Sequence, residues 1–492
     1  MKRIFWPLIR TALLVGALLQ GHAPLAQADS LPPTVAKALA NAKVPLNAAS
    51  FVVRKVEGDA VPVLSHRAGV PMNPASVMKL VTTFSALDML GPDFTWKTSF
   101  YTDGGLGNGV LNGDLIIRGG GDPKWVLERM QNNFRTLQVL GVRRITGDII
   151  LDNSVFELAE RNLADFDGEP MRPYNSAPDG LLVNFKALIL KFLPDPQTQT
   201  VRVVSEPPMA DVAIDTQVNA TTDGCGDWRS GLRADFSNPN KVRFNGNYSV
   251  RCGENTWPVA YMEPASYAVR VVKALHQASG GVLDGKVRYG KLPRGALLLW
   301  HAPSLPLSHI IADVNKFSNN VMAQQVFLTL SAQYSTFNTS LHLPGAARTG
   351  NFARSAATVQ HWWRERFGQL VKAPTLENGS GLSRNERITA QALGELLRLA
   401  SKHPSSNVFI NSLSVAGVDG TAARMANRGI VNAAIGNAQL KTGTLRDVVS
   451  IAGYAMSKSG QRYSVVGIIN HPNANAARPA LDALVEWAVV EN

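Results

Sequence analysis

The chain of 492 residues has only two cysteines, and beyond its first twenty residues it has no long apolar run. Two cysteines are too few for a disulfide-dense scaffold or for a cysteine-based zinc site. No later segment approaches the roughly 20 apolar residues that a membrane-spanning helix needs. The sequence also lacks an H-E-x-x-H pair and a complete G-x-S-x-G elbow, which disfavours zinc hydrolases and α/β-hydrolases.

The first 28 residues have the layout of a secretory signal peptide. Lys2, Arg3 and Arg10 are basic, residues 11–19 (TALLVGALL) are apolar, and residues 25–28 (LAQA) place small side chains at a cleavage site after Ala28. The apolar run is short for a membrane span, although an uncleaved anchor is the alternative. We therefore expect a mature protein of 464 residues that is secreted across the cytoplasmic membrane into the periplasm.

The net charge of +12 is spread along the chain without a dense basic run. Removal of the three basic residues of the signal peptide leaves +9. An excess of this size favours anionic surroundings, such as a membrane surface or an acidic cell wall. The secretory signal argues against nucleic acid as a partner.

Patterning along the chain changes twice. Helical periodicity at residues 74–90 gives way to turn-rich, alternating segments, and helical patterns return from residue 307. Three strand candidates (438–444, 448–456 and 463–470) precede a final helix at 477–490. We expect an α+β protein in which residues 29–100 and 291–492 form one catalytic domain, interrupted by a β-rich insertion of one or two domains at 101–290. Cys225 and Cys252 lie within this insertion, and an oxidising compartment predicts a disulfide between them.

A serine and a lysine stand three residues apart at the beginning of the first long helix, in NPASVMKL (73–80). Residues at this spacing face the same side of a helix, so the Ser76 hydroxyl and the Lys79 amine can touch. Pro74 suits the first helical turn, which places Ser76 near the positive end of the helix dipole. These features suit a nucleophilic serine and its base.

Two further motifs follow in order: Ser318, Asn319 and Asn320 in a helical segment, and Lys441, Thr442 and Gly443 in a strand. Each motif alone is weak evidence for an active site. Their order along the chain, and their positions at a helix start, in a helical segment and in a strand, are together typical of penicillin-binding proteins and serine β-lactamases. The gap of 242 residues between the first two motifs, and stretches such as GDLIIRGGGDP and VAGVDGTAARM, resemble the class C low-molecular-mass penicillin-binding proteins of the DacB type, peptidase family S13.

This resemblance implies a transpeptidase-like domain, an antiparallel sheet flanked by helices, with a large insertion. It implies a serine D-Ala-D-Ala carboxypeptidase that also acts as an endopeptidase on D-Ala cross-links of peptidoglycan, and that β-lactam antibiotics acylate. It requires neither a metal nor a cofactor. A β-lactamase-like hydrolase of the same superfamily and an inactive cell-wall-binding protein are the alternatives.

Each motif residue has a chemical role under this hypothesis. Lys79 takes the proton of Ser76 if its pKa is lowered, for which Lys441 is the expected cause. Ser318 passes the proton to the departing amine, and Asn320 holds the substrate backbone.

The strand motif suits substrate recognition. Lys441, Thr442 and Thr444 suit the terminal carboxylate, and Gly443 lets substrate lie against the strand. By resemblance, the backbone N–H groups of Ser76 and Thr444 form the oxyanion hole.

Two segments leave alternatives open. SGLSR (380–384) either lines the cleft or uses Gly381 only for a tight turn. Asp167 or Glu169 occupies the neighbourhood in which related proteins are thought to meet the amino end of the substrate, but Pro170 and Arg172 disturb the match.

Overall fold

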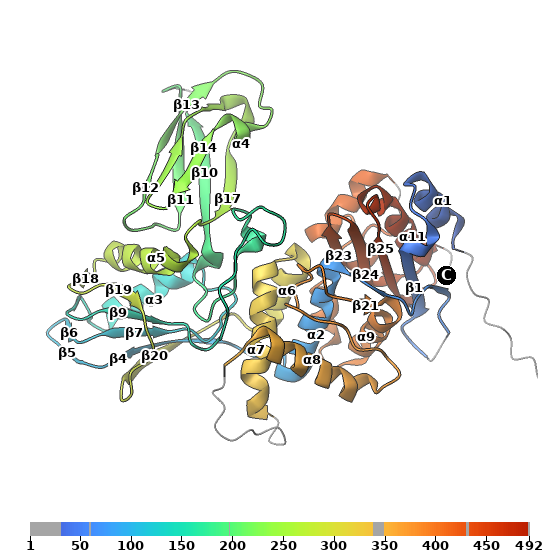
Figure 1. The fold of residues 1–492 in the computed structure, drawn as a ribbon, viewed down its shortest axis with the longest axis horizontal. Coiled ribbons are helices and arrows are strands. Elements are labelled where there is room, and N and C mark those ends of the chain that lie inside the picture. The colour runs from blue at the N-terminus through green and yellow to red at the C-terminus, as the bar shows by residue number, and fades with distance from the viewer. Residues whose placement is uncertain (1–30, 59–60, 196, 338–348, 430–431, 491–492) are drawn as a thin grey trace, which may run out of the picture.

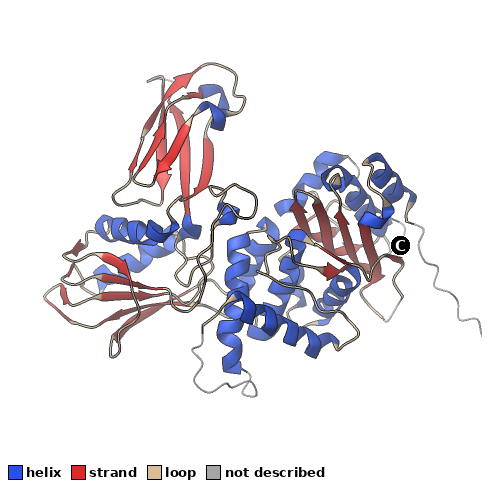
Figure 2. Cartoon of the chain, in the orientation of Figure 1, coloured by secondary structure: helices blue, strands red, loops and turns tan. Residues whose placement is uncertain are grey.

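The computed structural model describes residues 31–58, 61–195, 197–337, 349–429 and 432–490. The chain forms a mixed α+β structure, with a helix-rich lobe that contains both ends of the described chain and a β-rich lobe formed by its middle (Figures 1 and 2). The predicted signal peptide, residues 1–28, lies outside the described residues. Within the described ranges, no helix has the length and apolar character needed to cross a bilayer.

The helix-rich lobe is built on one antiparallel sheet of six strands in the order β2-β1-β25-β24-β23-β22. The first and last long strands pair along their whole length, with Ala49 opposite Ile469 and Lys55 opposite Tyr463. The strands are β1 (Ala49–Lys55), β2 (Leu64–His66), β22 (Ser414–Val415), β23 (Ala438–Leu445), β24 (Val448–Met456) and β25 (Arg462–Asn470). A small two-stranded sheet pairs β3 (Pro71–Met72) with β21 (Ile388–Thr389).

Helices cover both faces of this sheet, because its strands carry apolar side chains on both faces. One face packs against α1 (Pro33–Asn41) and α11 (Arg478–Val490). The other face carries α2 (Lys79–Leu90), α6 (Leu307–Phe317), α7 (Asn320–Phe337), α8 (Phe352–Phe367), α9 (Ala390–Lys402) and α10 (Ser406–Asn411). Figure 1 shows these helices gathered beside the sheet, with α2 next to α6.

Helix α2 is the central helix of the lobe. All residues from Lys79 to Leu87 are buried, since α2 contacts the helices α6, α7, α8, α9 and α10 around it. The sequence predicted one helix from Pro74 to Leu90, whereas the structure has a 3₁₀ turn, Ala75–Met78, followed by the α-helix. Ser76 therefore lies in a tighter turn ahead of the helix.

The first part of the β-rich lobe contains two small sheets and two helices around one apolar core. The sheets have the orders β19-β9-β7-β4-β20 and β18-β8-β6-β5. The elements are β4 (Lys97–Thr102), β5 (Gly105–Gly107), β6 (Val110–Asn112), β7 (Leu115–Arg118), α3 (Leu127–Val139), β8 (Arg144–Ile145), β9 (Ile149–Asp152), α5 (Pro264–Ala278), β18 (Val282–Leu283), β19 (Val287–Tyr289) and β20 (Leu297–Pro303).

The second part of the β-rich lobe is a group of strands between residues 187 and 260, which projects upward from the first part in Figure 1. Its sheets have the orders β16-β13-β11-β10-β17 and β12-β15-β14, around a core with Phe192 stacked on Tyr248. The elements are β10 (Ala187–Asp195), β11 (Thr200–Glu206), β12 (Ala213–Ile214), β13 (Gln217–Thr221), α4 (Trp228–Gly231), β14 (Ala234–Asn238), β15 (Lys241–Phe244), β16 (Asn247–Ser249) and β17 (Asn255–Ala260).

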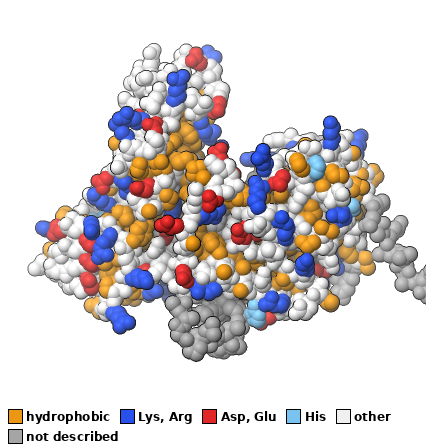
Figure 3. Space-filling model, in the orientation of Figure 1, with side chains coloured by type: hydrophobic (Ala, Val, Ile, Leu, Met, Phe, Trp, Pro, Cys, Tyr) orange, Lys and Arg blue, Asp and Glu red, His pale blue; other side chains and the backbone are white. Residues whose placement is uncertain are grey.

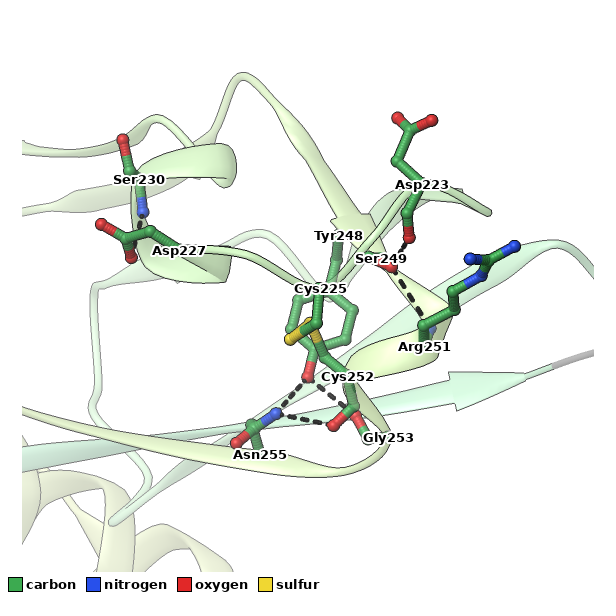
Figure 4. Close-up of a disulfide and its surroundings, with 10 residues drawn as sticks. All are labelled: Asp223, Cys225, Asp227, Ser230, Tyr248, Ser249, Arg251, Cys252, Gly253 and Asn255. Carbon is green, nitrogen blue, oxygen red and sulfur yellow. Dashed lines mark hydrogen bonds between the residues drawn. A yellow bond between two sulfur atoms is a disulfide. The ribbon is translucent and has the colours of Figure 1, made fainter.

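The predicted disulfide between Cys225 and Cys252 is present in this second group of strands (Figure 4). Next to it, the Tyr248 hydroxyl donates to the Gly253 carbonyl at 2.7 Å and accepts from the Asn255 amide at 2.8 Å. The disulfide therefore ties two polar loops to the edge of a small core.

We expect the double substitution Cys225→Ser and Cys252→Ser to destabilise this group of strands alone. Closing a loop of 27 residues contributes about 2–4 kcal/mol in the chain-entropy description. Amide hydrogen exchange in residues 187–260 should therefore accelerate by about tenfold or more, while strands β23 to β25 keep the wild-type exchange rate. Equal acceleration in both regions would contradict this expectation.

The strand bounds lead us to propose Lys97 and Pro303 as the limits of the insertion, slightly wider than the 101–290 expected from the sequence. An ion pair between Lys124 and Asp313, 2.5 Å apart, joins it to the helix-rich lobe. On the face drawn in Figure 3, Lys and Arg side chains are dispersed over both lobes.

Candidate active site

Ser76 occupies a short turn that neighbouring segments hold in place. The preceding residue, Ala75, has a positive φ of 47°, and its N–H donates to the side chain of Asn73 at 2.9 Å. The carbonyl of Pro74 accepts a hydrogen bond of 2.5 Å from the Ser450 hydroxyl on β24. The turn is therefore fixed from both sides, and the sheet determines where the Ser76 hydroxyl lies.

Lys79 is fully buried next to this hydroxyl. Its Nζ lies 3.0 Å from Ser76 Oγ, 2.6 Å from Asn320 Oδ1 and 2.5 Å from the carbonyl oxygen of Ser380. Burial is the main cause that holds the pKa of Lys79 well below its usual range, and the Lys441 charge lowers the pKa further. The sequence hypothesis named Lys441 as the cause, so it identified the smaller of these two effects.

Ser318 and Asn320 lie where α6 ends and α7 begins. Ser318 adopts the left-handed conformation with φ 60° and ψ 33°, which breaks the helix and turns its side chain toward β23. Asn320 is the first residue of α7. Its Oδ1 accepts from Lys79, and its Nδ2 donates to the Tyr174 carbonyl at 3.2 Å. Asn320 of the second motif therefore connects the Lys79 amine to the loop of the insertion that contains Tyr174.

Strand β23 supplies the third motif from the other side. The Nζ of Lys441 donates to Ser318 Oγ at 2.9 Å and to the Thr442 carbonyl at 2.8 Å, and burial lowers the Lys441 pKa to about 7. A side chain at position 443 would meet the Ser76 nitrogen at 3.0 Å and the Pro74 oxygen at 2.6 Å, so Gly443 is required for this close approach.

Sequence reasoning singled out residues 380–384 of the loop beside Lys79 but missed Glu386, the buried residue that holds this loop in shape. The fully buried carboxylate of Glu386 accepts four backbone N–H groups, from Glu377, Asn378, Gly379 and Gly381, at 2.8–3.0 Å. This loop aims the Ser380 carbonyl at Lys79. Gly381 has φ 78° and packs against the Ala75 carbonyl, so it serves both the tight turn and the contact with the site.

We expect Glu386→Ala to lower the free energy of unfolding by about 3–5 kcal/mol, because it leaves buried N–H groups without their acceptor. Urea unfolding measures this loss. The matched control is Glu365→Ala, which removes a half-exposed carboxylate from a surface pair with His361 and should change stability by about 1 kcal/mol or less. Similar losses in both variants would contradict this role of Glu386.

The two acidic candidates of the insertion lie in the loop that contacts Asn320. The carboxylate of Asp167 accepts from the Tyr174 hydroxyl and from the Asn175 amide, both at 2.8 Å. Burial acts to raise the pKa of Asp167, but these hydrogen bonds outweigh it and lower the pKa. Glu169 is largely exposed and pairs with Arg172. Asp167 therefore shapes the loop whose Tyr174 carbonyl reaches Asn320.

The five predicted residues thus lie in two hydrogen-bonded groups, one of Ser76, Lys79 and Asn320 and one of Ser318 and Lys441. Ser318 and Asn320 are two residues apart in the second motif and so hold the two groups near each other, and the third motif continues through Thr442, Gly443 and Thr444 on β23. In the described ranges, no group of three His, Cys, Asp or Glu side chains is placed to hold a metal ion. A hydroxyl beside a buried amine of lowered pKa, with a second lysine nearby, is the arrangement of a serine–lysine hydrolase.

Comparison with known proteins identifies the family. The profile of the D-Ala-D-Ala carboxypeptidase 3 (S13) family matches residues 31–490, so the chain belongs to this family. The chain is 23% identical to the D-alanyl-D-alanine carboxypeptidase DacB of Haemophilus influenzae over 422 residues, 85% of each chain. It is 26% identical to the D-alanyl-D-alanine carboxypeptidase of Actinomadura sp. (strain R39) over 444 residues, 87% of this chain and 78% of the relative.

Solved structures agree on the fold. The crystal structure of penicillin binding protein 4 (dacB) from Haemophilus influenzae superposes with a TM-score of 0.72 at 21% identity, covering 91% of this chain and 97% of that chain. A second crystal structure of that protein, complexed with a β-lactam, gives a TM-score of 0.69 at 21% identity and covers 92% and 98%. The predicted family and the α+β fold with β-rich additions are confirmed, and the chain is an S13-family D-Ala-D-Ala carboxypeptidase.

Proposed function

We propose that this carboxypeptidase acts in the periplasm on peptidoglycan stem peptides and also cleaves D-Ala cross-links, through an acyl-enzyme on Ser76. The observation that carries the proposal is the set of contacts around Lys79. As a neutral amine, Lys79 has two hydrogens for Asn320 Oδ1 and the Ser380 carbonyl, which leaves its lone pair for the Ser76 hydroxyl.

Acylation begins with transfer of the Ser76 proton to Lys79. The Ser76 oxygen then attacks the carbonyl carbon of the penultimate D-alanine, and the backbone N–H groups of Ser76 and Thr444 hold the oxyanion. The close approach of Gly443 to the Ser76 nitrogen supports this pairing of donors. Loss of one such donor costs about 3–4 kcal/mol of transition-state stabilisation.

Ser318 then relays to the departing nitrogen the proton that Lys79 took from Ser76: the Ser318 hydroxyl gives its own hydrogen to the nitrogen and takes up the proton from Lys79 in exchange. Its hydroxyl can donate to the leaving amine and accept from Lys441 at the same time, and Lys441 lies 2.9 Å away. The peptide bond breaks, the amine leaves, and the acyl group stays on Ser76. Water then hydrolyses the ester and restores the free hydroxyl.

Carboxypeptidase and endopeptidase reactions attack the same D-Ala carbonyl, so one site serves both. A penicillin places its β-lactam carbonyl in the same position and acylates Ser76. The Haemophilus influenzae protein of the same fold has been crystallised in complex with a β-lactam, which supports binding of such a compound.

The test is incubation of the purified protein with a stem pentapeptide and with a cross-linked muropeptide dimer. We expect free D-alanine from the first and monomers from the second, and neither product with Ser76→Ala. Failure of wild-type protein to form either product overturns the proposal. Release of D-alanine without monomers removes the endopeptidase part of it.

A further inference from the structure

Arg478, the first residue of α11, reaches the strand of the third motif. Its Nη2 donates to Thr444 Oγ1 at 3.1 Å and to Asn475 Oδ1 at 2.8 Å. Both acceptors are neutral. Among the described residues, no Asp or Glu side chain forms an ion pair with Arg478, although its guanidinium is only half-exposed. A half-buried arginine held by neutral oxygens retains donors for an anion.

The surroundings of Arg478 have an excess of positive charge. Burial lowers the pKa of Arg478, the charges of Arg428 and Arg424 lower it further, and the charge of Asp482 opposes them only in part. The one buried carboxylate nearby, Asp482, is engaged by Arg428, with a contact of 2.7 Å. Asp482 is therefore hydrogen-bonded to Arg428 and not to Arg478, and three arginines share its single negative charge, which leaves a net positive charge around Arg478.

The guanidinium of Arg478 contacts the strand that carries the third motif, one residue beyond the glycine that lies against the Ser76 turn. Thr442 and Thr444 are two residues apart and share one face of β23, with Gly443 between them in contact with the Ser76 turn. The Thr442 hydroxyl is bonded to Thr421 Oγ1 at 2.8 Å, whereas the exposed Thr444 is bonded to Arg478. The hydroxyl that Arg478 contacts thus belongs to the residue whose N–H is proposed for the oxyanion hole.

We propose that Arg478, together with the Thr444 hydroxyl, binds the free carboxylate that lies next to the scissile bond on the departing D-amino acid. This inference rests on the proposed function and adds a residue to the motif that sequence reasoning assigned to the carboxylate. The planar guanidinium matches a carboxylate with two parallel N–H donors. Asn475 orients it, and Arg424 and Arg428 strengthen the local positive potential.

The test compares two substrates that differ only at this group: an acyl-D-Ala-D-Ala peptide and the same peptide with a C-terminal amide. In wild-type protein, kcat/KM favours the free acid. For Arg478→Gln we expect the acid-over-amide preference to fall by about 10- to 100-fold, because the acid loses a charge-assisted contact that the amide never had. Hydrolysis of the amide should change by about twofold or less.

Two controls separate this effect from general damage. Arg144→Gln removes the same charge from an exposed ion pair with Asp284 in the insertion and should leave the preference unchanged. Arg478→Lys keeps the charge without the planar fork and should retain a reduced preference. If Arg478→Gln does not fold, Arg478→Lys becomes the test, and a decrease of about threefold or more supports the proposal.

An unchanged preference in a folded Arg478 variant overturns this inference and leaves the proposed function intact. A wild-type protein that hydrolyses neither substrate overturns the proposed function and the inference with it. The two failures are thus distinguishable.

Discussion

Ser76→Ala will abolish the covalent adduct that wild-type protein forms with benzylpenicillin. Intact-protein mass spectrometry should show one adduct per wild-type chain and none in the variant. The reason is local: the Ser76 hydroxyl is 3.0 Å from the buried amine of Lys79, and no other group can replace the oxygen atom that forms the ester.

The matched control is Ser85→Ala, in helix α2, which follows the Ser76 turn. The Ser85 hydroxyl bonds only to the Thr82 carbonyl of its own helix, so this variant should form the adduct normally. An adduct that persists in Ser76→Ala would contradict the assignment of the nucleophile. Release of the wild-type adduct within seconds would favour the β-lactamase-like alternative, whereas persistence over many minutes is expected for a carboxypeptidase without a dedicated deacylating base.

Lys441→Met will slow acylation by about 10²- to 10⁴-fold at neutral pH and move the acidic limb of its pH profile to higher pH. Lys79 must be neutral to accept the Ser76 proton, so acylation fails as Lys79 becomes protonated on acidification. The Lys441 charge lowers the pKa of Lys79, and its removal lets that pKa rise. The loss of acylation therefore begins at a higher pH in the variant.

The second-order rate of penicillin acylation between pH 5 and pH 10 measures both effects. Lys458→Met, which removes an exposed lysine from the turn after β24, is the control and should leave rate and limb unchanged. An acidic limb that stays in place or moves to lower pH in Lys441→Met would contradict the electrostatic coupling. If the acidic limb keeps its wild-type position and only the maximal acylation rate falls, Lys441 acts through its contact with Ser318 and not through the pKa of Lys79.

Sequence alone located the elements that carry the motif residues, because each of these elements has a recognisable pattern. Ser76 and Lys79 precede an apolar helix, and Lys441 lies in a strand predicted at 438–444 that the structure extends by one residue. The three strand candidates at the end of the chain correspond to β23, β24 and β25. Only the family resemblance predicted that segments separated by hundreds of residues would meet.

The groups that hold the motif residues in place could not be predicted, since the pattern of side chains in the sequence does not identify them. Lys79 is held by the carbonyl of Ser380 and Asn320 by that of Tyr174, and every residue carries a carbonyl. Glu386 reads as an ordinary charged loop residue until four backbone N–H groups are seen to converge on it. Arg478 likewise reads as a surface cation at the beginning of a helix.

Because β1 pairs with β25, the candidate active site cannot assemble until synthesis of the polypeptide is nearly complete. About 420 residues separate Ala49 from Ile469, and the central sheet cannot close until the last strand has been made. A chain that stops before residue 438 carries Ser76 and Lys79 but lacks Lys441 and the strand that lies against Ser76. Truncated or nascent forms are thus inert by topology, without a separate inhibitory segment.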